Sequence, residues 1–205
     1  MSSLGLVNYG SGNYGSVYNA LSYLNLNPVE IAAPADLHHV GRIILPGVGS
    51  FPNVMRKLHS IGMIDGLREH VAQRGKPLLG ICVGMQVLAD VGYEFEEATG
   101  LGFIPGSVRR IDVEKLGLSI PHIGWNQLTL SAACPLFKEM TAAPSFYFIH
   151  SYEYCSTAAA HTVATCDYGY ALAACVQRNQ VFGVQFHPEK SQHDGLQLLR
   201  NFATL

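Results

Sequence analysis

Charged side chains are scarce in this chain of 205 residues. Asp, Glu, Lys and Arg together make up 14% of it, against about 25% in an average soluble domain. The 13 basic and 15 acidic residues include no strongly basic run, so nucleic acid binding has no electrostatic basis. A surface this poor in charge indicates that something else covers part of its apolar area, because interface cores are depleted in charge.

Long apolar runs are absent as well. No stretch reaches the roughly 18 apolar residues that a membrane-spanning helix needs. Residues 1–10 also lack the basic start and apolar run of a signal peptide. We therefore expect a cytoplasmic protein that does not bind membranes.

Metal and redox motifs are the third absence. No two cysteines form a C-x-x-C pair, which argues against a zinc ribbon or a thioredoxin-like site. The five cysteines are irregularly spaced: Cys82, Cys134, Cys155, Cys166 and Cys175. We expect all but Cys82 to be reduced and mostly buried. Three histidines without ligand-spaced companions are predicted to lie at the surface: His38, His39 and His193. The sequence predicts no metal site and no cofactor.

Apolar residues, by contrast, are plentiful at 48% of the chain, enough for a real core. No repeat or linker divides the sequence, so we expect one domain spanning residues 1–205. In the first half, apolar runs alternate with helical patterns, which predicts a mostly parallel sheet with helices on both faces. The second half is richer in strands. The expected fold class is α/β, a mixed sheet flanked by helices with a small antiparallel annex.

The expected elements can be given by residue range. Strands are predicted over 4–8, 28–32, 42–45, 77–81, 107–113, 120–125, 145–154, 161–166, 171–177 and 180–185. Helices are predicted over 14–24, 51–74 with a break near Gly62, 83–90 and 192–202.

The clearest local motif is G-x-C-x-G, from Gly80 to Gly84, where a buried strand meets a helix. This is the cysteine counterpart of the nucleophile elbow, whose sharp turn needs small neighbours. Cys82 would lie at a helix N-terminus, where the dipole favours a thiolate and the amide of Val83 can bind an oxyanion. The alternative is a buried core cysteine in an ordinary strand-to-helix turn.

A base for that nucleophile follows a later strand. His187 comes directly after Phe186, with Pro188 and Glu189 behind it. Glu189 is close enough in sequence to turn back onto the imidazole and fix its tautomer, as the third member of a triad does. The alternative is a solvated helix start, with Ser191 as its cap and His187 in a loop.

Together, G-x-C-x-G-x-Q and the later F-H-P-E resemble class I glutamine amidotransferases. The resemblance implies a flavodoxin-like fold and hydrolysis of L-glutamine to glutamate and ammonia through a cysteinyl thioester. Further segments resemble the glutaminase subunits of imidazole glycerol phosphate synthase, and the likeness covers about residues 4 to 203. These segments are residues 9–13, 45–51, 100–106, 121–126 and 187–191.

This resemblance implies a heterodimer with a cyclase subunit, HisF, which is a (β/α)8 barrel. Ammonia would pass to HisF for formation of imidazole glycerol phosphate and AICAR in histidine biosynthesis. One rival is the glutaminase of another pathway, such as the anthranilate type, which usually has S-P-G-P-G where this chain has Leu45 to Gly49. Another rival is a non-catalytic cysteine-elbow protein, for binding or redox sensing, which leaves His187 and Glu189 unexplained.

Site roles follow from the same resemblance. Cys82, His187 and Glu189 would form the triad, and the amide of Val48 or Gly49 would join that of Val83 in the oxyanion hole. The residues expected at the substrate are Gly47, Gln86, Glu94, Ser151 and Tyr152. Those expected at the partner interface are Tyr9, Asn13, Trp125, Asn126, Tyr147 and Lys190. The alternatives are surface positions for Ser151 and Tyr152, and ordinary core packing for Trp125.

Overall fold

A computed structural model describes residues 3–205, and a nine-stranded sheet runs through its centre. The strand order is β2-β1-β3-β4-β13-β12-β11-β8-β9. The bounds are β1 (Leu4–Val7), β2 (Val29–Ile31), β3 (Arg42–Leu45), β4 (Leu78–Ile81), β8 (His122–Leu130), β9 (Ser145–His150), β11 (Thr162–Asp167), β12 (Ala171–Arg178) and β13 (Val181–Val184). Pairing is parallel from β2 to β13 and antiparallel beyond.

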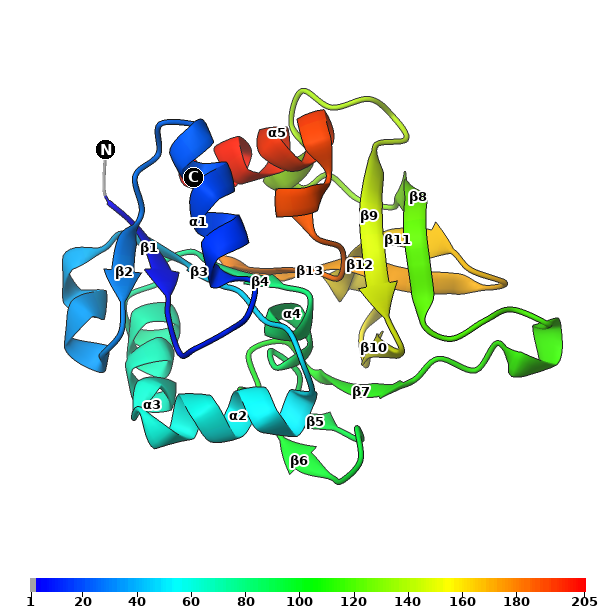
Figure 1. Ribbon diagram of the computed structural model, residues 1–205, viewed down its shortest axis with the longest axis horizontal. Coiled ribbons are helices and arrows are strands. Elements are labelled where there is room, and N and C mark those ends of the chain that lie inside the picture. The colour runs from blue at the N-terminus through cyan, green and yellow to red at the C-terminus, as the bar shows by residue number, and fades with distance from the viewer. Residues whose placement is uncertain (1–2) are drawn as a thin grey trace.

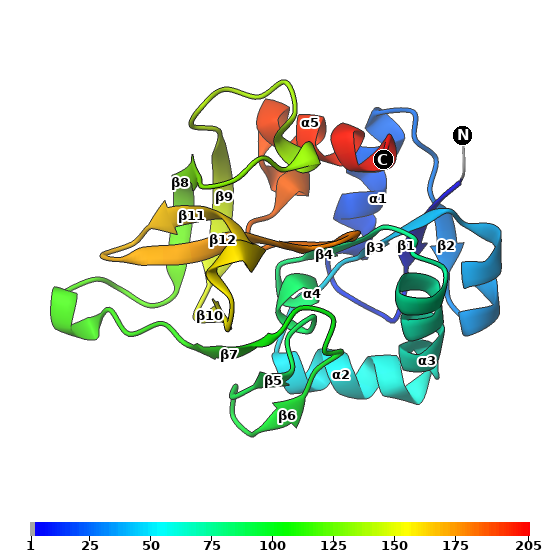
Figure 2. The same cartoon turned by 180° about the vertical axis from the view of Figure 1, so that it is seen from behind.

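Helices cover both faces of the parallel half (Figure 1). Helices α1 (Tyr14–Tyr23) and α5 (Gln192–Ala203) lie on one face. The other face carries α2 (Phe51–Ser60), α3 (Met63–Arg68) and α4 (Val83–Gln86), as the view from behind also shows (Figure 2). Short helical turns complete the chain: η1 (Pro34–His39), η2 (Glu69–Gln73), η3 (Glu114–Leu116), η4 (Pro135–Phe137), η5 (Ala159–His161) and η6 (Pro188–Lys190). No helix in residues 3–205 is long and apolar enough to cross a membrane.

A second, smaller sheet has the order β10-β7-β5-β6. Its strands are β5 (Val91–Gly92), β6 (Ala98–Thr99), β7 (Gly106–Arg110) and β10 (Tyr152–Ser156). The fold class is therefore confirmed, with one correction to the annex: β5 pairs with β7 in parallel, so this sheet is mixed and not purely antiparallel. Residues 1–2 of the predicted single domain lie outside the described residues.

Several predicted elements have different bounds. The strand expected over 120–125 runs from His122 to Leu130, and the one expected over 107–113 ends at Arg110. The strand expected over 145–154 is two strands, since the chain leaves the main sheet after His150 and enters the second sheet at Tyr152. The helix expected over 83–90 ends at Gln86. The helix does not continue, because the carbonyls of Val87 and Leu88, just after Gln86, accept hydrogen bonds from the amides of Leu101 and Phe103. The break near Gly62 is confirmed, with a left-handed φ of 67° there.

The parallel half of the sheet positions the candidate site. Every residue of β1, β3, β4 and β13 is buried, which explains why these strands are continuous apolar runs without alternation. Their carboxyl ends share one edge of the sheet, where α/β proteins bind ligands. The segments that follow these strands begin at Asn8, Pro46, Cys82 and Gln185.

Candidate active site

Cys82 occupies a strained turn between β4 and α4. Its backbone has φ 55° and ψ −114°, a conformation that costs a non-glycine residue about 1–3 kcal/mol and persists only where the surroundings enforce it. The sequence predicted this elbow from its two glycines. This strained backbone turns the chain sharply between strand and helix and places the thiol at the start of α4.

The glycines are required because backbones pass very close to one another here. A Cβ on Gly84 would lie 2.0 Å from the carbonyl oxygen of Leu45, and one on Gly80 would lie 2.4 Å from the oxygen of Gly84. A Cβ on Gly47 would lie 2.3 Å from the nitrogen of Gly84. The loop after β3 is thus pressed directly against the nucleophile turn.

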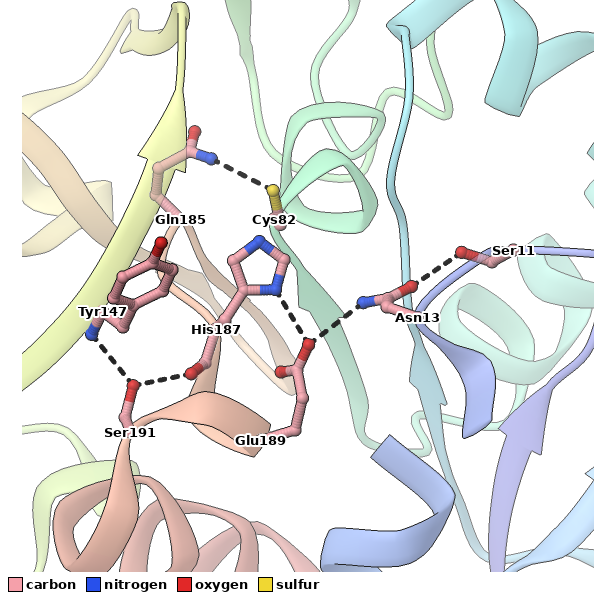
Figure 3. A network of polar contacts seen from close by, with 8 residues as sticks. All are labelled: Ser11, Asn13, Cys82, Tyr147, Gln185, His187, Glu189 and Ser191. Carbon is pink, nitrogen blue, oxygen red and sulfur yellow. Dashed lines mark hydrogen bonds and ion pairs between the residues drawn. The ribbon is translucent and has the colours of Figure 1, made fainter. Parts of the chain in front are cut away.

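His187 is brought to Cys82 by strand pairing. Strands β4 and β13 are parallel neighbours with Ile81 opposite Val184, so the segments that leave them lie side by side. The Nδ1 atom of His187 lies 2.8 Å from Oε1 of Glu189, and the ring lies between that carboxylate and the thiol (Figure 3). Both side chains of the ion pair are almost fully buried, which rules out the solvated helix start.

The ionisation of His187 is strongly displaced. Burial lowers its pKa, but hydrogen bonds and charge interactions with Cys82 and Glu189 outweigh burial and raise the pKa to about 10. The site therefore favours an imidazolium beside the sulfur, the arrangement that stabilises a reactive thiolate.

Several side chains hold this pair in place (Figure 3). The hydroxyl of Ser191 donates to the carbonyl of His187 over 2.6 Å and accepts the amide of Tyr147 over 3.0 Å. Ser191 thus fixes the histidine and makes no side-chain cap for α5. Nδ2 of Asn13 lies 3.4 Å from Oε1 of Glu189, and the hydroxyl of Ser11 donates to Asn13.

The predicted oxyanion donors are not all available in this structure. The amide of Val83 donates over 3.3 Å to the carbonyl oxygen of Gly47, which lies where an oxyanion would need donors. Val48 and Gly49 line the pocket beside it. The loop is also held from behind, since the hydroxyl of Tyr9 donates to the carbonyl of Pro46 over 2.6 Å. Burial raises the pKa of Tyr9 to about 12, so this hydroxyl keeps its proton.

A pocket of about 350 Å³ opens above Cys82 and His187, at the small end of the range for small-molecule sites. Of the predicted substrate residues, Gln86, Glu94, Ser151 and Tyr152 line this pocket, whereas Gly47 does not. The carboxylate of Glu94 accepts the amide of Phe51 over 2.8 Å. Burial raises its pKa, and the amide of Phe51 opposes this shift. Ser151 and Tyr152 are half-buried, which disfavours simple surface positions.

The predicted interface residues fall into two groups. Tyr9 and Asn13 are buried and make the internal contacts given above. Trp125 is 50% exposed, which argues against ordinary core packing, and it lies opposite Tyr147 across β8 and β9. Lys190 is exposed at the pocket mouth. Asn126 donates to the carbonyl of Asp167 over 2.8 Å.

Sequence reasoning missed two features of the site. Gln185 is completely buried beside Cys82, and His122 forms a buried pair with His150, which lines the pocket. Gln185 could have been found as the one amide in an otherwise apolar run that leads to His187. The histidine pair gave no such signal, because its members are far apart in sequence.

The other titratable groups of the described residues do not gather at a metal site. Within residues 3–205, no three His, Cys, Asp or Glu side chains are grouped so that they could hold a metal ion. The five cysteines are free thiols, and all but Cys155 are buried. His38, His39 and His193 are exposed, as predicted.

Comparison with known families decides the assignment. Residues 6–204 match the family "Glutamine amidotransferase class-I". The chain belongs to this family. The predicted family and the predicted class of enzyme, a glutamine amidotransferase, are confirmed.

Similar curated sequences include several HisH subunits of imidazole glycerol phosphate synthase. "Imidazole glycerol phosphate synthase subunit HisH 1" of Campylobacter jejuni subsp. jejuni is 41% identical over 98% of this chain and 100% of its own length. The HisH subunit of Desulfitobacterium hafniense is 45% identical over 97% and 92%. The HisH subunit of Ruegeria pomeroyi is 41% identical over 97% of both chains.

Solved amidotransferase structures agree on the fold. A structure described as a glutamine amidotransferase superposes with a TM-score of 0.76 at 21% identity, over 98% of this chain and 99% of the other. The structure of PurLQS from Thermotoga maritima also gives 0.76, at 20% identity over 100% and 99%. At these identities the likeness shows the fold alone.

Proposed function

We propose that this chain is the glutaminase subunit of an imidazole glycerol phosphate synthase, acting in histidine biosynthesis. The observation that carries the proposal is the alignment of Cys82, His187 and Glu189, of which Cys82 and His187 line a pocket sized for a small molecule. The HisH relatives, matched over nearly their whole length, support the choice of pathway.

The reaction follows from the positions of these groups. The thiol proton passes to Nε2 of His187, because Nδ1 already faces Glu189. The sulfur of Cys82 attacks the side-chain amide carbon of L-glutamine, and His187 returns the proton to the departing ammonia. The same imidazole then takes a proton from water, which hydrolyses the thioester to glutamate and frees Cys82.

The pocket supplies groups for the amino-acid end of L-glutamine. The half-buried carboxylate of Glu94 suits the substrate ammonium, because opposite charges attract strongly where water is partly excluded. Ser151 and Tyr152 also line the pocket and would contact the other end of the substrate. Gly47 would act through its peptide group, whose amide side belongs to Val48.

The conformation of the loop after β3 implies that the isolated chain hydrolyses glutamine slowly. A carbonyl oxygen of Gly47 beside the amide of Val83 repels a developing oxyanion and occupies one of its donors. Rotation of the peptide between Gly47 and Val48 would withdraw that oxygen and present an N–H instead. We therefore expect low activity from the isolated chain and strong stimulation by a partner that favours the rotated loop.

The partner surface is a row of apolar side chains on neighbouring strands. Ile123 is opposite Ile149, and Trp125 is opposite Tyr147. Ile123, Trp125 and Ile149 are 55%, 50% and 40% exposed, and large exposed apolar groups in one patch mark an interaction surface. Ile149 and Lys190 also line the pocket mouth. A (β/α)8-barrel cyclase, HisF, docked here in a cytoplasmic heterodimer would receive ammonia before solvent could protonate it.

The proposal is tested by measuring glutamate formation with and without the cyclase subunit. We expect slow hydrolysis alone, marked stimulation by the cyclase, and none in Cys82→Ala although that variant still binds the cyclase. Cys166→Ala changes another buried cysteine, on β11, that does not line the pocket, and should keep wild-type activity. Glutamate production by Cys82→Ala would reject the proposal, and full activity without the cyclase would reject the tight coupling.

A further inference from the structure

Gln185 has no part in the reaction described above, although its side chain is hydrogen-bonded to the sulfur of Cys82. It is 0% exposed and directly follows β13. Its Nε2 lies 3.8 Å from Sγ of Cys82 (Figure 3). A fully buried amide is costly unless its polar atoms are paired, so its orientation has to be explained by its neighbours.

The orientation of Gln185 is fixed by a backbone carbonyl. Nε2 of Gln86 lies 3.2 Å from the carbonyl oxygen of Tyr152 and 3.0 Å from Oε1 of Gln185. A carbonyl oxygen only accepts, so the group of Gln86 that faces Tyr152 must be its NH2 group. The atom of Gln185 that receives the second N–H must then be its oxygen. Its NH2 group is left to face the sulfur.

The same carbonyl is held from its other side by the buried histidine pair. Nδ1 of His150 lies 2.8 Å from the oxygen of Tyr152, and Nε2 of His150 lies 3.0 Å from Nδ1 of His122. Burial lowers the pKa of both histidines to about 4, so both are neutral near pH 7. Since Nδ1 of His150 must donate to the carbonyl, its Nε2 accepts from His122, which gives one consistent set of donors.

We propose that Gln185 is a further catalytic residue, whose amide N–H donates to the sulfur of Cys82 and stabilises the thiolate before attack, with Gln86 fixing its orientation. When the S–H bond breaks, the proton goes to Nε2 of His187 and the electron pair stays on sulfur, opposite the Gln185 donor. This deepens the proposed glutaminase activity and rests on Cys82 being its nucleophile.

The test is the rate at which iodoacetamide alkylates Cys82 in Gln185→Met, read by peptide mass spectrometry. Methionine keeps the length of the side chain but has no donor. We expect alkylation at pH 7 to fall about tenfold, because a hydrogen bond to a charged group is worth roughly a factor of ten or more. The rate should approach that of the wild type in alkaline solution, where the thiol ionises without help. Gln177→Met, the same change on β12 away from the pocket, should leave both rates unchanged.

A folded Gln185→Met protein with a wild-type rate at pH 7 would overturn the proposal. If Gln185→Met does not fold, Gln86→Met tests the same proposal. Without the N–H of Gln86, Gln185 is free to turn its oxygen toward the sulfur. It should also slow alkylation at pH 7 severalfold, and an unchanged rate would overturn the proposal. Alkylation needs no glutamine, so a wild-type complex that hydrolyses no glutamine would reject the proposed function without deciding the role of Gln185.

Discussion

His187 has the most displaced ionisation among the groups of the site. Its pKa of about 10 lies above the ordinary value of 6.5 because Cys82 and Glu189 overcome the effect of burial. The folded protein therefore holds a proton that the unfolded chain releases over the intervening pH range. By linkage, the stabilisation from this proton is complete below about pH 6.5 and is lost as the pH rises toward 10.

The stability of the His187→Gln variant should reveal this linkage. The difference in unfolding free energy between wild type and variant is expected to shrink as the pH rises from 7 to 10. Urea unfolding at several pH values measures it. His39→Gln, a change at an exposed histidine, is the control and should show no such trend. A constant difference for His187→Gln would mean that the folded state holds no extra proton there.

Glu189 acts on the reaction through the imidazole. Glu189→Gln keeps the shape of the side chain but removes the charge that stabilises the imidazolium and fixes its tautomer. We expect kcat for glutamine hydrolysis, measured with the cyclase present, to fall by about 10³- to 10⁴-fold, with KM little changed. A drop of less than tenfold would show that Glu189 only fills space.

Local chemistry explains which site residues could be predicted. The triad positions could be predicted because an elbow needs small residues around Cys82 and because Glu189 follows His187 closely in the chain. Gln185 could not, since its proximity to Cys82 depends on the pairing of two strands about a hundred residues apart. The position of the Gly47 carbonyl beside Val83 could not be predicted either, because residue types do not determine how a single peptide group is oriented.

At the scale of elements, the junction of β3, β4 and α4 is tightly constrained. Its three glycines leave no space for a Cβ. The strands of the parallel half could be predicted to within a residue or two because burial on both faces gives them continuous apolar runs. The end of α4 could not, since it depends on amides of residues 101–104, which donate to the carbonyls of residues 87–89 just after the helix.

Two glycine-to-alanine substitutions separate the effect of close backbone approach from the effect of helix propensity. Gly84→Ala is expected to unfold or inactivate the protein, because the new Cβ would lie 2.0 Å from the oxygen of Leu45. Gly15→Ala lies in α1 with nothing within 4 Å of the new Cβ, and should stabilise the protein by about 0.5–1 kcal/mol. Thermal unfolding and glutaminase activity measure both. Equal effects of the two changes would contradict the close approach at Gly84.

At the scale of the whole molecule, the exposed row on β8 and β9 continues into the pocket mouth at Ile149. Few charges occur in this chain, and an apolar docking face is consistent with that composition. The row could be anticipated from the sequence only in part: Trp125 and Tyr147 were expected at an interface, whereas Ile123 and Ile149 become visible only once the strands are paired.

Trp125→Ala tests the docking face directly. Truncating a half-exposed aromatic at the centre of an interface should weaken cyclase binding by about 10- to 100-fold. The unfolding of the isolated chain should change little. Tyr23→Ala removes another exposed aromatic, at the end of α1, and should bind the cyclase as the wild type does. Calorimetric titration of each variant with the cyclase gives the answer, and equal affinities would place the interface elsewhere.

The central claim is that Cys82 attacks the side-chain carbon of glutamine bound in the pocket above it. The most direct measurement uses a glutamine analogue in which an electrophilic ketone replaces the amide, followed by peptide mass spectrometry of the complex with the cyclase. The account predicts a single label on Cys82, slowed by excess L-glutamine and absent from Cys82→Ala. Labelling of a different cysteine, with Cys82 unmodified while glutamate is still formed, would contradict it.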